Sequence, residues 1–380
     1  GGPEQTVVVG LLAIVGVLLV VLLLSSREDP GPGDRAGGSS RRGPGRSAKY
    51  VGSQACRRCH QEIAASYAGH PMARTLSPVN DALSIEDFAS GLEGFTAGRR
   101  SYRVERQGKQ VMHFESMTGD DTRPLYEQGE AIAYAIGAGV KGRSYLLQRK
   151  GLFFESPITW YTHKKVWDLS PGYSPALHYR FSRRVGDDCL ACHAGRVAVE
   201  PEATVDRYVA DRPFLEASIG CERCHGPGSE HVAIYEESSD GTDVTDSRIV
   251  NPAGLSATLQ EDVCNQCHLE GKVRVLGPGR RFADFRPGES LSKTWTVFVG
   301  EAPVDTQQRP LFTSHVEQMH ASHCYLGSRG KLGCTSCHDP HRVPSARQRE
   351  AFYSERCLRC HADRGCSLPE QQRRKPPAAG

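Results

Sequence analysis

Six times in this chain, two cysteines stand three residues apart and a histidine directly follows the second cysteine. Numbered in chain order, these are motif 1 (56–60), motif 2 (189–193), motif 3 (221–225), motif 4 (264–268), motif 5 (334–338) and motif 6 (357–361). With 14 Cys and 15 His in 380 residues, chance predicts about 0.02 copies of this pattern. C-x-x-C-H is the attachment signature of c-type haem, in which the thiols add to the porphyrin vinyl groups and the histidine binds the iron. The sequence therefore predicts six covalently bound haem c groups.

The motifs name the residues that would hold these haems. The thiols are Cys56, Cys59, Cys189, Cys192, Cys221, Cys224, Cys264, Cys267, Cys334, Cys337, Cys357 and Cys360. The near-face iron ligands are His60, His193, His225, His268, His338 and His361. Paired C-x-x-C motifs can also form a zinc site, and a single one can be a redox dithiol. Neither alternative needs a histidine after every second cysteine, so haem is the preferred interpretation.

Composition limits how this chain can build a core. Only 38% of its residues are hydrophobic and 7% aromatic, while Gly (40) and Pro (23) are plentiful. A loop-rich chain of this kind would struggle to form a large core from side chains alone. We therefore expect a multihaem cytochrome c fold, with short helices and loops wrapped around stacked haems and little regular structure. The formal net charge of +3 is not the footprint of a nucleic-acid partner.

The N-terminal part predicts membrane attachment. Residues 7–24 are an unbroken apolar or glycine run, long enough to span a bilayer. We interpret 1–27 as an uncleaved signal anchor with a transmembrane helix, with a cleaved signal peptide as the alternative. A Gly/Pro/Ser/Arg-rich flexible linker follows at 28–48. Haem attachment takes place outside the cytoplasmic membrane, so we expect a single-pass protein whose haem domain faces the periplasm or cell exterior.

The remainder divides into haem-bearing and haem-free parts. A first haem segment (49–94) contains a predicted helix at 61–68, which Gly69 ends. Residues 95–168 contain no motif and form a predicted β-rich insertion. Alternating residues at 101–106 and 110–115, and at 143–148 and 152–155, predict two hairpins there. A five-haem domain (169–366) and a disordered tail (367–380) complete the expected organisation.

The other face of each iron needs a second ligand or stays open, and a second histidine gives an electron-transfer haem. Nine histidines lie outside the motifs: His70, His113, His163, His178, His231, His315, His320, His323 and His341. His341 follows His338 too closely to reach the far face of the same haem, so it is predicted to bind a neighbouring iron. We also predict His231, His70 (with Met72 as its rival), His178 and, from the group His315, His320 and His323, His320 as iron ligands. His113 and His163 lie in the β-rich segment and are interpreted as structural.

Two cysteines, Cys324 and Cys366, lie outside the motifs. Spare cysteines in an oxidising compartment often pair. A disulfide between them is the first hypothesis, and two unpaired thiols are the alternative.

The stretches at 50–53, 221–228, 264–271 and 334–341 resemble multihaem cytochromes with doubled C-x-x-C-H motifs. These are often found in planctomycete-type bacteria, and many carry C-terminal tetratricopeptide repeats. More distantly, the chain is similar to the tetrahaem cytochromes of ammonia oxidisers. The resemblance covers 49–366 and implies iron ligation by His231 and His341 and a role in electron transfer. Relatives usually continue past 364–366 into another haem motif and the repeats, whereas this sequence departs from that pattern with a Gln/Arg/Lys/Pro stretch at 371–377.

Two functions follow from these features. The first is a membrane-anchored hexahaem cytochrome that carries electrons from a quinol-linked membrane donor to a cytochrome or terminal reductase. The second is an oxidoreductase in which one five-coordinate haem acts on a small nitrogen or sulfur compound, with the β-rich insertion as a wall. No C-x-x-C-K motif is present, and nine spare histidines suffice for six irons. The electron carrier is therefore favoured over the enzyme.

Overall fold

The computed structural model describes residues 47–119, 123–201, 206–237, 248–300 and 314–361. By its contacts the chain has two units, 1–41 and 42–380, and every described residue belongs to the second. The predicted membrane helix (7–24) and tail (367–380) lie outside the described residues. No helix within the described ranges is both long enough and apolar enough to cross a membrane.

Short helices carry motif 1. They are α2 (Ser53–Arg57), α3 (Gln61–Ala68) and the 3-10 helix η1 (Pro71–Arg74). The helix predicted at 61–68 is confirmed, and Gly69 forms its C-cap, with its N–H bonded to the carbonyls of Ser66 and Tyr67. Between motif 1 and the first strand, only Gly69, His70 and Thr75 lie outside these helices.

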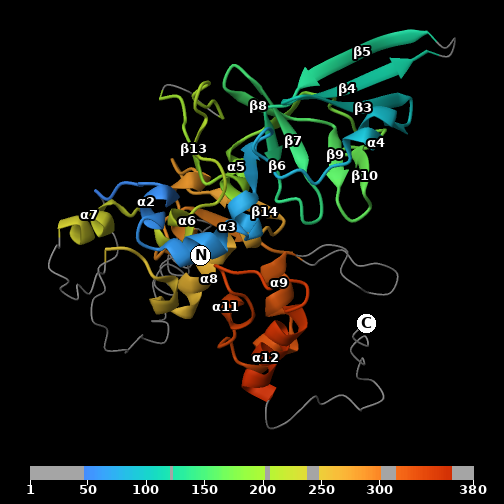
Figure 1. The fold of residues 1–380 in the computed structure, drawn as a ribbon. Helices are drawn as coiled ribbons and strands as arrows, with labels where there is room; N and C mark the ends of the chain where they lie inside the picture. Colours follow the sequence, from blue (N-terminus) through green and yellow to red (C-terminus); the bar gives the residue numbers. More distant parts are fainter. Residues whose placement is uncertain (1–46, 120–122, 202–205, 238–247, 301–313, 362–380) are drawn as a thin grey trace, which may run out of the picture. The chain divides into compact units, whose positions relative to one another are not determined.

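A β-rich segment follows, with strands drawn from blue through blue-green to green in Figure 1. The strands are β1 (Leu76–Pro78), β2 (Phe95–Ala97), β3 (Arg100–Gln107), β4 (Gln110–Thr118), β5 (Pro124–Ala131), β6 (Tyr134–Ile136), β7 (Ser144–Arg149), β8 (Leu152–Glu155), β9 (Ile158–Tyr161), β10 (Val166–Leu169) and β11 (Arg183–Val185), and α4 (Phe88–Glu93) precedes β2. They form a five-stranded sheet β1-β6-β7-β8-β11, a four-stranded sheet β2-β3-β4-β5 and a two-stranded sheet β10-β9.

Both predicted hairpins are present. β3 pairs antiparallel with β4 from Arg100–Met117 to Gln107–Gln110, and β7 pairs with β8 across the turn at Lys150 and Gly151. Both turn residues have positive φ (50° and 75°), as a two-residue turn matched to the strand twist requires. The strands extend from β1 to β11, beyond the 95–168 range expected from alternation, because distant short strands join the sheet edges.

Side-chain cores lie mainly in this segment. One cluster gathers Tyr102, Val104, Tyr145, Trp160 and Trp167 with their neighbours. A second joins strand residues, among them Leu146 and Phe153, to Leu190 and Ala194 of the helix that carries motif 2. Motif 2 is thus packed on the β-rich segment.

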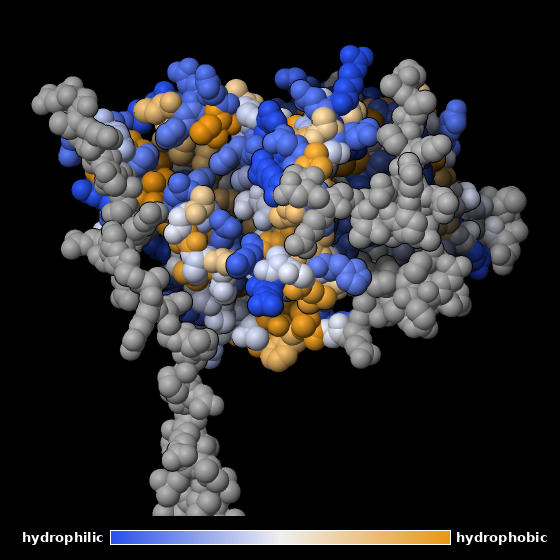
Figure 2. Space-filling view, turned by 90° about the horizontal axis from the view of Figure 1, so that it is seen from below, coloured by the Kyte–Doolittle hydropathy of each residue, from blue (hydrophilic) through white to orange (hydrophobic). Residues whose placement is uncertain are grey.

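The remaining elements are short and mostly helical. They are α5 (Asp187–His193), β12 (Arg196–Val197), β13 (Phe214–Glu216), α6 (Glu222–His225), α7 (Ser229–Glu237), η2 (Pro252–Gly254), α8 (Ala257–His268), β14 (Val273–Leu276), η3 (Phe282–Asp284), η4 (Leu291–Lys293), β15 (Trp295–Phe298), α9 (His315–His320), α10 (His323–Gly327), α11 (Cys334–Cys337) and α12 (Arg349–His361). A small third cluster surrounds Trp295. Figure 2 shows one face of the molecule, on which apolar residues are exposed among hydrophilic ones.

Candidate haem sites

Each motif lies on a helical turn. Motifs 2, 3, 4 and 6 sit in helices that end at the motif histidine, which are α5, α6, α8 and α12. Motif 1 spans the end of α2 and the N-cap of α3, and the cysteines of motif 5 bound α11. Residues three apart share one face of a helix, so both thiols of a motif are turned to the same side. That is the arrangement that two thioether bonds to one porphyrin require.

The middle residues of motifs 2, 3 and 4 bind one another. Arg223 Nη2 of motif 3 donates to the Ala191 carbonyl of motif 2 at 2.6 Å. Gln266 Nε2 of motif 4 donates to the Arg223 carbonyl at 3.0 Å. These bonds hold three motifs side by side, although the sequence separates the first from the last by 70 residues or more.

Thiols of different motifs also lie close enough to shift one another's pKa. Cys56 neighbours Cys221, Cys192 neighbours Cys267, and Cys264 neighbours Cys334. These contacts join motif 1 to 3, motif 2 to 4 and motif 4 to 5. Helices α11 and α12, which carry motifs 5 and 6, also pack together. All six motifs therefore belong to one continuous cluster.

Three contacts between histidine rings are found in the described part of the chain. His60 faces His231 with ring centroids 6.2 Å apart and planes 14° from parallel. His225 faces His341 at 5.9 Å and 9°. His268 and His315 lie 5.4 Å apart at 53°. Each contact joins one motif histidine to one histidine outside the motifs.

The spacing of these rings fits an iron between them. With a metal–nitrogen bond of about 2 Å on each side and roughly 1 Å from nitrogen to ring centre, two ligating imidazoles have centroids about 6 Å apart. The first two pairs match this separation. His231 and His341, both expected to be far-face ligands, are the partners in these pairs, and His341 faces the histidine of motif 3 rather than its own motif 5.

His225 is also held in the form that binds iron. Its Nδ1 lies 2.8 Å from the Val250 carbonyl oxygen, which can only accept, so Nδ1 carries the proton. The lone pair of the neutral ring is then on Nε2. Burial lowers the pKa of His225, although the hydrogen bond to the Val250 carbonyl acts in the opposite direction, and the lowered pKa favours the neutral ring. A carbonyl that fixes the tautomer and orientation of a ligating histidine is a usual part of a metal site.

Helix α9 contains two histidines, His315 and His320, and only one of them contacts the histidine of motif 4. His315 Nδ1 lies 3.4 Å from His268 Nδ1, whereas His320 Nε2 is 3.0 Å from a Glu261 carboxylate oxygen and its ring stacks on Tyr325. His315, and not the predicted His320, is therefore the histidine that lies against the motif 4 ring. Ser314 and Glu317 form a capping box that starts α9 at His315. The S-x-x-E pattern was visible in the sequence and could have singled out this position.

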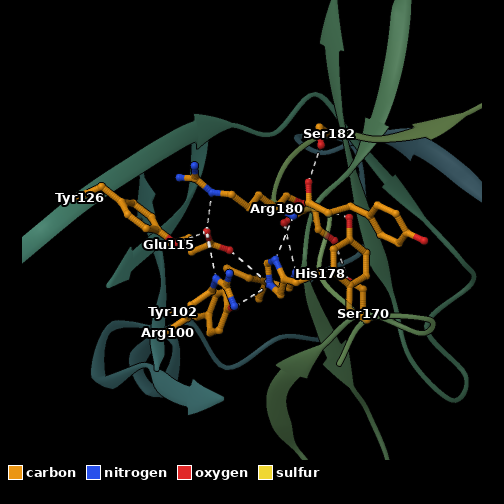
Figure 3. A network of polar contacts seen from close by, with 12 residues as sticks. Arg100, Tyr102, Glu115, Tyr126, Ser170, His178, Arg180 and Ser182 are labelled. Atoms are coloured by element: carbon orange, nitrogen blue, oxygen red, sulfur yellow. Dashed lines mark hydrogen bonds and ion pairs between the residues drawn. The ribbon is translucent and has the colours of Figure 1, made fainter. Parts of the chain in front are cut away.

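His178 has partners other than a motif histidine. Its Nδ1 accepts from the Arg180 backbone N–H at 2.9 Å, and its Nε2 lies 2.7 Å from Tyr102 Oη and 3.3 Å from a Glu115 carboxylate oxygen. Figure 3 shows this network around the buried Glu115, which also accepts from Tyr126 and Arg180. Both ring nitrogens are engaged inside the β-rich segment. Iron ligation needs a free lone pair, so His178 could bind iron only if these contacts were broken.

His70 caps a helix. Its Nδ1 accepts from the Met72 N–H at 3.2 Å at the start of η1, which places the proton of the neutral ring on Nε2. The ring would have to give up this bond to bind iron through Nε2.

His113 is fully buried with Nδ1 2.8 Å from Ser156 Oγ. Cys324 is exposed, and Cys366, its predicted partner, lies outside the described residues.

Comparisons with known proteins agree with the motif pattern. The family model described as doubled CXXCH motif matches residues 328–365, and the model for cytochrome c554 and c-prime matches residues 162–226. Multiheme cytochrome MtrA of Shewanella baltica (strain OS185) is 24% identical over 198 residues, covering 48% of this chain and 55% of that protein. The chain is a multihaem c-type cytochrome with doubled C-x-x-C-H motifs. The cytochrome thus spans about half the length of this curated relative.

A solved structure, that of Outer Cell Wall Cytochrome OcwA, also matches the cytochrome. The match covers 76% of this chain and 56% of that chain, with 17% sequence identity and a TM-score of 0.44.

Three motif histidines of the cytochrome have no second histidine against their rings within the described ranges. His193 is partly buried, and its Nδ1 has no hydrogen-bond partner there. His338 lies against Tyr353 with centroids 6.0 Å apart, and His361 is the exposed last residue of α12. In the same ranges no group of three or more Cys, His, Asp or Glu side chains is arranged to hold a metal ion.

Proposed function

We propose that this cytochrome transfers electrons along a chain of six haems, one on each motif. The observation that carries this proposal is the set of three histidine pairs, each of which joins a motif histidine to one outside the motifs. An iron with histidine on both faces has no open position for a substrate and serves electron transfer. Bound haem supplies a one-electron iron couple. The residues of this chain supply spacing, axial ligands and burial.

Contacts between motifs support a continuous path. The neighbouring thiols Cys56 and Cys221 connect motifs 1 and 3, and Cys264 and Cys334 connect motifs 4 and 5. The hydrogen bond from Gln266 to the Arg223 carbonyl links motif 3 to motif 4. Motif 6 follows motif 5 through the packing of α12 on α11. Motif 2 joins this path as a branch through Cys192 and Cys267.

The membrane and the redox partners belong to the same proposal. The apolar run at 7–24 would anchor the protein in the cytoplasmic membrane, with the haem domain on the periplasmic or outer side. A quinol-linked membrane protein would donate electrons, and a cytochrome or terminal reductase would accept them. Membrane fractionation of the full chain and of a chain without residues 1–27 tests the anchor, which requires that only the full chain sediment with the membranes.

Electron paramagnetic resonance of the purified holoprotein tests the ligand assignments. Each of His231→Ala, His341→Ala and His315→Ala is expected to convert one low-spin iron to high spin, because each removes one axial nitrogen. His320→Ala is the matched control in the same helix as His315 and is expected to leave the count unchanged. If all three ligand variants keep their full haem content and an unaltered number of low-spin irons, the proposed chain of haems with two histidine ligands is wrong.

A second candidate rests on motif 2. His193 has no histidine opposite it among the described residues, and its helix packs on the β-rich segment. An open iron there would allow chemistry on a small nitrogen or sulfur compound. The unmodified protein would then contain a high-spin iron that binds carbon monoxide, and Cys189→Ser with Cys192→Ser would abolish that signal. Six low-spin irons in the unmodified protein would exclude this candidate.

A further inference from the structure

A small cavity lies between motifs 2 and 3. Its volume is about 70 Å³, and a water needs only about 10–15 Å³, so it can hold a small polar group but not a porphyrin. Its walls include Leu190 and Ala191 of motif 2, Arg223 of motif 3, and Tyr50 and Arg196. The cavity thus touches two haem-bearing helices directly.

The cationic groups around this cavity are incompletely satisfied. Arg196 stacks its guanidinium over the Tyr50 ring, 5.1 Å from the centroid, and among the described residues it makes no side-chain hydrogen bond or ion pair. Arg223 uses Nη2 on the Ala191 carbonyl, while its buried Nε has no partner. The positive charge of Arg286 also acts on Tyr50, whose pKa is raised by burial, so the hydroxyl stays protonated and can donate.

The acidic residues of the walls are already engaged. Glu222 accepts from the backbone N–H groups of Val51, Gly52 and Gly228. Asp187 accepts from Tyr208 Oη and from the Arg281 guanidinium, and Glu216 accepts from the Ser53 N–H at 3.1 Å. No ion pair joins Arg196 to Glu216, although β12 and β13 place them opposite each other. The acidic side chains of the walls thus already have donors, whereas the Arg196 guanidinium and Arg223 Nε have no hydrogen-bond partner among the described residues.

We infer that the cavity is a carboxylate-binding site, in which Arg196 and Tyr50 hold a planar oxyanion with Arg223 behind it. A guanidinium fork matches the two oxygens of a carboxylate. The carboxylate has two possible sources: a propionate of a haem bound at motif 2 or 3, or a small free anion such as acetate. Only the propionate source rests on the proposed haem-binding function.

The test compares holoprotein with Arg196→Gln and with Arg212→Gln, an exposed arginine away from the cavity. Acetate binding is measured by calorimetry at constant ionic strength, and haem midpoint potentials by spectroelectrochemical titration. If the anion is free, the unmodified protein binds one acetate and Arg196→Gln weakens binding about tenfold or more, the loss expected for a charge-assisted bond. If the anion is a propionate, acetate does not bind, and Arg196→Gln lowers the potential of one haem because an uncompensated negative charge favours the oxidised iron.

Arg196→Lys and Tyr50→Phe keep the test independent of folding. Lysine retains the charge without the planar fork, so Arg196→Lys is expected to give an effect smaller than that of Arg196→Gln, and Tyr50→Phe a partial one. Equal acetate binding and equal potentials in Arg196→Gln and Arg212→Gln would overturn the inference. A failure of the haem assignment itself appears separately, as low haem content in the unmodified protein.

Discussion

At the residue scale, Glu222 ties the first haem segment to motif 3. Its side chain is 2% exposed, and it accepts the N–H groups of Val51 (2.9 Å), Gly52 (2.7 Å) and Gly228 (2.8 Å). The first two precede motif 1 and the third follows motif 3. One carboxylate therefore satisfies three backbone donors from segments about 170 residues apart.

Glu222→Ala is expected to destabilise the holoprotein by about 3 kcal/mol, because it leaves buried donors without an acceptor. Glu222→Gln keeps one acceptor oxygen and should cost about half as much. The measurement is the denaturant midpoint, followed by circular dichroism. Glu237→Gln, an exposed position in α7, is the control and should match the unmodified protein. A midpoint for Glu222→Ala equal to that of the control would contradict this role.

Sequence patterns identified the type of these residues better than their partners. The motif histidines follow from the C-x-x-C-H pattern alone, and the position of His341 close behind His338 already pointed to a different haem. The pairing of His341 with His225, and of His231 with His60, depends on how loops bring distant segments together. The contacts of His178 with Glu115 and with the Arg180 N–H could not be predicted, because they depend on a strand that is distant in the sequence and on the local turn.

At the element scale, the β-rich segment was predictable where pairing is local. Its two hairpins follow from alternation and turn residues, since both strands of each lie within a few residues of each other. β1 and β11 were not predicted, because three-residue strands carry no periodicity and pair with partners far along the chain. The side of β8 that meets β11 places Glu155 beside Arg183.

Glu155 makes this segment sensitive to pH. Burial raises the pKa of Glu155 from 4.5 to about 7, although Arg183, 2.8 Å away, acts in the opposite direction. Between these values the folded state binds more protons than the unfolded state. The contribution of Glu155 to the free energy of unfolding is therefore fully present below pH 4.5. It is lost as the pH rises through about 7, by up to about 3 kcal/mol.

Hydrogen exchange of peptides from β7, β8 and β11 measures this loss at about pH 5 and about pH 8, after correction for the intrinsic rate. In the unmodified protein, opening is expected to become easier at the higher pH. Glu155→Gln, which cannot ionise, should show the same opening free energy at both. A persisting pH difference in this variant would assign the effect to another group.

At the scale of the whole molecule, the side-chain core is unevenly distributed. None of the three apolar clusters includes a residue of the described segment 314–361. Only Val316 and Phe352 are buried hydrophobic residues there, while Leu326 and Leu358 are 61% and 54% exposed. The four helices of this segment carry motifs 5 and 6. Covalently bound porphyrins would cover their apolar side chains and replace the missing core.

Removal of haem should therefore affect the β-rich segment and helices α9 to α12 differently. In an apoprotein with every motif cysteine replaced by serine, helices α9 to α12 are expected to exchange their amide protons at nearly unprotected rates, because no apolar cluster holds them. Strands β3, β4, β7 and β8 should keep much of their protection, since their core consists of side chains such as Tyr102, Leu147 and Trp160. A double variant that removes only haem 5, Cys334→Ser with Cys337→Ser, should loosen α9 to α12 while leaving the strands unchanged. Equal protection of the helices and strands in the apoprotein would mean that porphyrins are not the core of this region.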